Sequence, residues 1–119
     1  MILKDIQELL GAQLVGSVES LGREVQSCYA SDLISDVLTF HGQKSLLLTG
    51  LTNAQVIRTA EILDFVAICF VRGKEPQPET ARLAQQNDVP LLVTDLTMYE
   101  SCGRLYARGL LGPTRSAGS

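Results

Sequence analysis

Three short apolar runs, separated by segments of helical periodicity, constrain the fold of this chain more than any other feature of its sequence. The runs are Leu46–Leu48, Phe65–Val71 and Leu91–Val93, and they recur at intervals of about two dozen residues. Strands that are apolar at successive positions are buried on both faces, and strands connected through helices run parallel. We therefore expect an α/β fold with three layers, α/β/α, and a mostly parallel sheet of four or five strands.

The segments around these runs carry apolar residues at helical or strand spacing. Before the first run we expect a helix over residues 2–10, a strand over 12–18, a turn at 21–23, a strand over 25–29 and a helix that ends at 41–42. Ser31 and Asp32 are the expected caps of that last helix. Further helices are expected on Val56–Leu63, after Pro78, and on a segment with Tyr99, Cys102, Leu105 and Tyr106 at core spacing.

Length and charge narrow the class of protein. The 119 residues suffice for one domain, which we expect to span residues 1–111, followed by a small, polar and mobile tail over residues 112–119. The net charge of −3 argues against nucleic acid as a partner, because binding to phosphates requires a basic face. No apolar run approaches the roughly 18 residues of a membrane helix. With no signal peptide in view, we expect a cytoplasmic protein without membrane contact.

Residues suited to catalysis are sparse. Cys28, Cys69 and Cys102 form an odd number without a CxxC pair, so we expect three buried, reduced thiols and no metal site. The single histidine, His41, precedes a glycine and is expected at the surface. The sequence contains no GxxxxGK[ST] phosphate loop, no GxGxxG and no GxSxG. These features predict a protein that is not an enzyme and that holds no cofactor.

Polar residues instead gather where the apolar runs end. Ligands of open α/β sheets bind beyond the carboxyl ends of the strands, and parallel strands all finish at one edge. Gly50 ahead of a helix N-terminus is typical of an anion cradle, Arg72 would add a full positive charge, and Asp95 would accept a hydrogen bond from a ribose or base. The candidate ligand-binding residues are Thr49, Gly50, Thr52, Asn53, Arg72, Gly73, Thr94, Asp95 and Asp32.

A purely structural interpretation of the same residues stays open. Thr52 with Gln55, and Thr97 with Glu100, have the spacing of capping boxes, which need no ligand. Asp32 and Asp36 lie one helical turn apart and either face one ligand or serve as a cap and a solvated surface residue. Three tyrosines could stack on a base, but the helical spacing of Tyr99 and Tyr106 favours packing in the core for those two residues.

Several strings of the sequence resemble stand-alone DRTGG-domain proteins of anaerobic bacteria, over roughly residues 1–110. They are the nine residues from Tyr29 to Val37, the nine from Leu48 to Val56, the seven from Phe70 to Pro76, and the five from Cys102 to Tyr106. The string D-R-T-G-G itself does not occur. The resemblance implies a fold like the N-terminal domain of HPr kinase/phosphorylase, which is related to the UDP-substrate-binding domain of Mur ligases.

The resemblance also implies a regulatory or assembly-forming role rather than catalysis. We expect a non-catalytic domain that senses a ligand, such as a nucleotide or other small phosphate-bearing anion, at the strand ends. The alternative is a structural module for dimerisation or docking, associated with a redox (hydrogenase-type) or phosphotransfer system. A homodimer, and a partner enzyme in the second case, are the expected assemblies.

Overall fold

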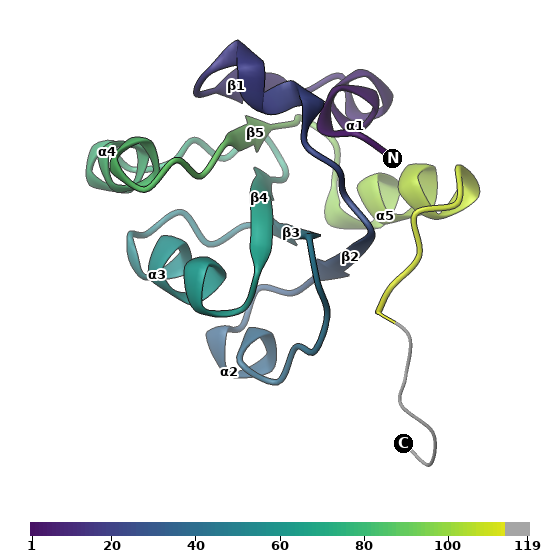
Figure 1. Cartoon of the computed structure of the whole chain (residues 1–119). Coiled ribbons are helices and arrows are strands. Elements are labelled where there is room, and N and C mark those ends of the chain that lie inside the picture. Colours follow the sequence, from purple (N-terminus) through teal and green to yellow (C-terminus); the bar gives the residue numbers. More distant parts are fainter. Residues whose placement is uncertain (114–119) are drawn as a thin grey trace.

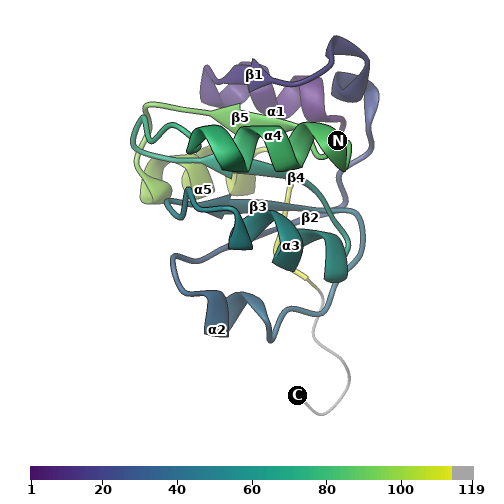
Figure 2. The ribbon, with the colours of Figure 1, turned by 90° about the vertical axis from the view of Figure 1, so that its left-hand side faces the viewer.

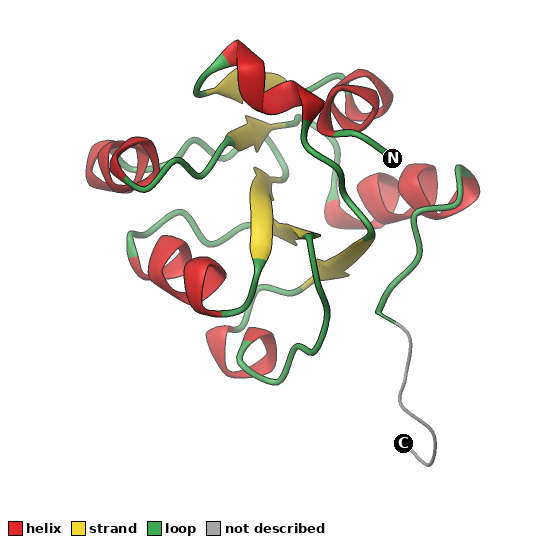
Figure 3. Cartoon of the chain, in the orientation of Figure 1, coloured by secondary structure: helices red, strands yellow, loops and turns green. Residues whose placement is uncertain are grey.

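The structure, a computed structural model, describes residues 1–113 as a five-stranded sheet between two layers of helices (Figures 1 and 3). The strand order is β1-β5-β4-β3-β2. Strands β2 to β5 run parallel, and β1 pairs antiparallel with β5 at one edge. The strands are β1 (Gln13–Val15), β2 (Ser27–Ala30), β3 (Ser45–Thr49), β4 (Phe65–Phe70) and β5 (Leu91–Val93). The expected α/β/α fold with a mostly parallel sheet is confirmed.

Five α-helices cover the two faces of the sheet. One face is covered by α2 (Ile34–Val37), α3 (Gln55–Ile62) and α4 (Pro78–Gln86), and the other by α1 (Leu3–Leu10) and α5 (Met98–Ala107). Figure 2 shows α3 and α4 in front of the strands and α5 behind them. A 3-10 helix, η1 (Val18–Gly22), follows β1. The helices α2, α3 and α4 follow one another in space as they do in the sequence, because each connects neighbouring parallel strands.

The two cores follow from the alternation of side chains along the strands. In β3, Leu47 packs with Phe70 and Ile57 on the face of α3, whereas Leu46 and Leu48 pack on the face of α1 and α5. All of these side chains are fully buried. The continuous apolar runs are therefore explained by helices on both sides of the sheet, because each successive side chain enters one core or the other.

The predictions that differ from the structure concern short elements and one helix face, each inferred from a local residue pattern alone. The strand predicted for residues 12–18 ends at Val15, because Gly16 takes a φ of 146° and Val18 begins η1. The helix after Ser31 and Asp32 has only four residues, and neither side chain caps it. Tyr99 and Tyr106, which were predicted to pack in the core, are 87% and 69% exposed. Leu105 carries the packing of that helix, so the apolar face is narrower than the spacing suggested.

The segment after α5 follows the edge of the sheet. The backbone N–H of Cys28 in β2 donates to the carbonyl of Leu111, at 3.0 Å, so this segment runs beside the outer strand. Most of the predicted mobile tail, residues 114–119, lies outside the described residues. Within residues 1–113 no helix has the length and hydrophobicity needed to cross a membrane.

Candidate functional site

The carboxyl ends of β2, β3, β4 and β5 lie along one edge of the sheet, as the prediction required. The carbonyl of Thr49 accepts from the N–H of Val71, at 3.1 Å, and the N–H of Thr94 donates to the carbonyl of Phe70, at 3.0 Å. The loops after the strands are also joined, since the N–H of Ser31 donates to the carbonyl of Leu48, at 3.1 Å. The four loops therefore form one continuous surface.

At the centre of this surface, three candidate residues form a cluster, which we call the strand-end cluster: Asp32, Gly50 and Arg72. One carboxylate oxygen of Asp32, Oδ1, accepts from the N–H of Gly50 at 2.6 Å. The other, Oδ2, lies 3.4 Å from a guanidinium nitrogen of Arg72. Both side chains are close to half exposed, so the ion pair itself contributes at most about 1 kcal/mol to stability.

Gly50 leaves room for a side chain of its own chain. A Cβ atom at this position would collide with the end of the Arg72 guanidinium and would lie 3.2 Å from Asp32 Oδ1. The space that a side chain would fill is therefore occupied by Arg72 of the same chain. Gly50 brings a positive charge next to its own N–H group, and the carboxylate of Asp32 contacts both.

The backbone of Arg72 is held in an unusual conformation by the loop after β5. Arg72 has a φ of 59° and Gly73 a φ of 66°. The N–H of Arg72 donates to the carbonyl of Leu96, and the N–H of Gly73 to the carbonyl of Thr94, both at 2.8 Å. Positive φ is costly for a side chain such as arginine. The two hydrogen bonds stabilise this backbone conformation. No sequence signal identifies the carbonyls of Leu96 and Thr94 as their acceptors.

Gly73 and Asp95 form a second close approach on the same surface. A Cβ atom on Gly73 would lie 3.0 Å from Asp95 Oδ1, so a larger residue would push the Asp95 carboxylate away. Asp95 is exposed. Its position next to the β4 loop keeps it available as an acceptor beside the strand-end cluster.

The two threonines that end β3 and β5 face inward. Thr49 is fully buried, and its hydroxyl oxygen accepts from the N–H of Leu51 at 3.1 Å. Thr94 is 1% exposed and donates its hydroxyl proton to the carbonyl of Leu10, at 2.6 Å. These hydroxyls hold the loops and α1 in place. They would therefore help to position a ligand site without contacting the ligand themselves.

The turn before α3 supplies both structural contacts and free donors. The predicted capping box of Thr52 and Gln55 is wrong, because α3 starts from Ala54 without a side-chain cap. Asn53 instead accepts from the N–H of Gln55 at 3.1 Å, and the carbonyl of Thr52 accepts from Thr80, at 2.7 Å. Within the described residues, the N–H groups of Thr52, Asn53 and Ala54 have no acceptor. The second box is present in part, as Thr97 accepts from the N–H of Glu100 at 3.2 Å.

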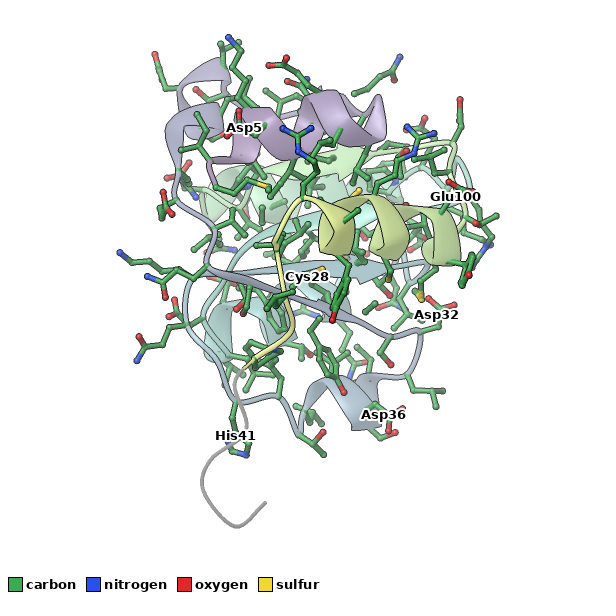
Figure 4. All side chains as sticks on the ribbon, turned by 90° about the vertical axis from the view of Figure 1, so that its right-hand side faces the viewer. Asp5, Cys28, Asp32, Asp36, His41 and Glu100 are labelled. Atoms are coloured by element: carbon green, nitrogen blue, oxygen red, sulfur yellow. The ribbon has the colours of Figure 1, made fainter. Side chains whose placement is uncertain are left out.

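Other polar residues lie away from this cluster. Figure 4 shows Asp36 on α2 apart from Asp32, with His41 towards the opposite side of the view. The tyrosine hydroxyl of Tyr29 donates to the carbonyl of Asp36 at 3.2 Å, and its ring packs against Phe40. Tyr29 is therefore occupied by packing and by a hydrogen bond within the chain.

The three cysteines are free thiols with weak acidity. Burial raises the pKa of Cys69 to about 12. Burial also raises the pKa of Cys28 above the ordinary thiol value, and the nearby thiols of Cys102 and Cys69 raise it by smaller amounts. Burial also raises the pKa of Cys102. Only Cys69 is a buried residue as predicted, since the other two are partly exposed. Thiols with raised pKa values are poor nucleophiles near neutral pH. Within residues 1–113 no group of three or more His, Cys, Asp or Glu side chains could hold a metal ion.

Comparisons with known proteins place the fold. No protein-family model matches the sequence, and no curated protein matches it. Among solved structures, the chain is similar to the CBS and DRTGG domains of the regulatory region of Clostridium perfringens pyrophosphatase, crystallised with its activator diadenosine tetraphosphate. The TM-score is 0.72 at 15% identity, over 87% of this chain and 45% of that one, so this chain spans less than half of that protein's length. The chain therefore has a DRTGG-like α/β fold.

Proposed function

We propose that this chain is a non-catalytic regulatory domain of the DRTGG type, and that it senses a phosphate-bearing ligand at the strand-end cluster. The observation that carries the proposal is the Arg72 guanidinium, half exposed and lying over Gly50, where four strand ends meet. The free N–H groups of Thr52, Asn53 and Ala54 lie on the same turn. Backbone N–H groups at a helix N-terminus beside a fixed cation are suited to phosphate oxygens.

The carboxylate of Asp32 acts as an internal anion. It contacts the same two groups, the Gly50 N–H and the Arg72 guanidinium, that would contact a phosphate. The ligand therefore competes with Asp32 and moves the loop after β2. Release of this loop, which leads into the short helix α2, would be the signal read by a partner. The activator bound by the similar pyrophosphatase region supports a nucleotide as the ligand class.

A thermal unfolding series tests the proposal. We expect diadenosine tetraphosphate or ATP to raise the melting temperature, because a ligand that binds only the folded state at 100 times its Kd stabilises it by about 2.7 kcal/mol. For a domain of this size each kcal/mol corresponds to a shift of roughly 4 °C. Adenosine, which lacks phosphate, serves as the control. Equal shifts with adenosine, or no shift with any of these compounds at millimolar concentration, would contradict the proposal.

A second function, self-association through α5, is favoured by one observation. Tyr99 and Tyr106 flank Gly103 on the exposed face of this helix, and a Cβ atom at Gly103 would meet nothing within 4 Å. Glycine inside a helix costs about 1 kcal/mol relative to alanine, and the chain's own packing does not require it. Glu100 and Arg104 of the same helix pair with each other within the chain, at 3.7 Å, so they add no unpaired charge beside the two tyrosines.

Analytical ultracentrifugation tests this second function. The wild-type chain should sediment as a dimer at micromolar concentration, and Tyr106→Glu should convert it to a monomer by placing a charge in the apolar contact. Ile62→Glu is the matched control, because Ile62 is similarly exposed, at 77%, but lies on α3 on the other face of the sheet. A wild-type monomer throughout, or equal effects of both variants, would exclude α5 as the contact.

A further inference from the structure

A cavity beside α4 lies outside the strand-end cluster, since none of Asp32, Gly50 and Arg72 lines it. It has a volume of about 690 Å³ and separates α4 from the segment that joins β1 to η1. Val89 and Pro90, just before β5, and Gly16, just after the antiparallel β1, form its inner end. Val89 and Pro90 lie at the amino end of β5, whereas Pro78, the first residue of α4, also lines the cavity, so the cavity extends along α4. Its volume is in the range of small-molecule sites, about 300–1,000 Å³.

The cavity exists because one strand lacks a helix above it. Val15 of β1 faces the core beneath α2, α3 and α4, where it is only partly buried. Helix α4 is the last helix on that face, and Ser20 of η1 also lines the cavity. The lining includes an apolar set of small or rigid side chains, Val15, Ala81, Ala84 and Pro90, which we call the floor. Ser17, Ser20 and Gln85 add polar groups beside it. A flat apolar group fits such a floor, because it removes apolar surface from water without requiring hydrogen bonds there.

The rim of this α4 cavity carries an available positive charge. Arg82 lies on the rim and is exposed, and within residues 1–113 its side chain has no hydrogen-bond or ion-pair partner. The acidic residue of the rim, Asp88, is already paired, because Arg23 donates to its carboxylate at 2.5 Å and to its carbonyl at 3.0 Å. The guanidinium of Arg82 is therefore available to bind an anionic ligand. Arginine binds planar anions with two parallel hydrogen bonds.

We propose that the α4 cavity binds a small organic acid with a flat apolar body and one carboxylate, sulfonate or phosphate group. The apolar body lies on Val15, Ala81 and Ala84, and Arg82 binds the anionic group. This site is independent of the strand-end cluster, so it gives the domain a second ligand input.

The fluorescent probe 1-anilinonaphthalene-8-sulfonate has this chemistry, with an aromatic body and a sulfonate. Titration of the probe into the folded chain should show one saturable site with enhanced fluorescence. Arg82→Gln should weaken binding about tenfold by removing a charge-assisted hydrogen bond. Ala81→Leu, which keeps a good helix former but fills the floor, should abolish the site. The matched control is Arg58→Gln, an exposed arginine on α3 outside the cavity, which should bind as the wild type does.

Amide spectra of the wild-type chain with the same probe give a readout that does not depend on the variants folding. The Gly16 and Val89 signals should move on binding. Probe binding that is unchanged in Ala81→Leu, equal losses in both arginine variants, or signals that move only at α5 would overturn the assignment. Absence of binding to the wild type would also overturn it. None of these results bears on nucleotide binding at Arg72.

Discussion

Ile68→Asp is expected to unfold the domain. Ile68 lies at the middle of β4, pairs with Leu47 and Leu91 on the two neighbouring strands, and has no exposed surface. A carboxylate at this position would have no partner in a core made of Leu, Phe and Val side chains. Burial of an unpaired charge costs several kcal/mol, which is comparable with the whole stability of a domain of this size. Circular dichroism and chemical denaturation measure the loss.

Two further variants keep this prediction measurable if Ile68→Asp does not fold. Ile68→Ala should lower the free energy of unfolding by about 2–5 kcal/mol, because it removes buried apolar surface and leaves a cavity. Ile62→Ala is the matched control at an exposed position of α3, and it should change stability by less than about 0.5 kcal/mol. If Ile68→Asp melts cooperatively near the wild-type temperature, β4 is not the central strand.

Arg72→Ala and Asp32→Asn are expected to change nucleotide binding in opposite directions. Loss of Arg72 should weaken binding of diadenosine tetraphosphate by about 1.5–3 kcal/mol, the scale of a hydrogen bond to a charged group. Asp32→Asn removes the internal negative charge that competes for Arg72, so the same ligand should bind more tightly. Isothermal titration calorimetry measures both changes against the wild-type chain. The opposite signs separate competition by Asp32 from a simple loss of fold.

The controls for this pair are Arg58→Ala and Asp36→Asn, two exposed residues of the same types outside the cluster. Both should bind as the wild type does. The stability of Arg72→Ala should stay within about 1 kcal/mol of the wild type, because the ion pair is half exposed. Weaker binding by Asp32→Asn would mean that Asp32 holds the ligand itself rather than competing with it.

The sequence predicted the layers of the fold well because burial on both faces leaves a continuous apolar signal. Residues 65–71 illustrate this, as nearly every side chain of β4 enters one core or the other. Short elements were predicted less well. The helix at Ile34–Val37 has a single turn, and Leu33 and Leu38 beside it are 59% and 55% exposed, so its apolar spacing did not report a buried face.

The candidate site was predictable only as a set of strand ends. The parallel sheet brought Gly50 and Arg72 to one edge, as expected, but the sequence could not show that Arg72 lies over Gly50. Asp32 was predicted to cap a helix. Its carboxylate instead accepts a hydrogen bond from the N–H of Gly50, which lies 18 positions further along the chain. Such a contact depends on the register between β2 and β3, and the conformational preferences of the individual residues do not determine that register. The exposed tyrosines of α5 were missed because helical spacing does not reveal how wide a buried face is.

Amide spectra of the labelled chain, titrated with diadenosine tetraphosphate, show directly whether a phosphate-bearing ligand binds at Asp32, Gly50 and Arg72. When the ligand binds, the N–H of Gly50 should donate to a phosphate oxygen instead of to the Asp32 carboxylate, and the N–H groups of Thr52 and Asn53 should gain an acceptor. We therefore expect the signals of Gly50, Thr52, Asn53 and Gly73 to move together and to saturate. Signals that stay fixed there at millimolar ligand, or that move only at residues remote from this edge of the sheet, would contradict the claim.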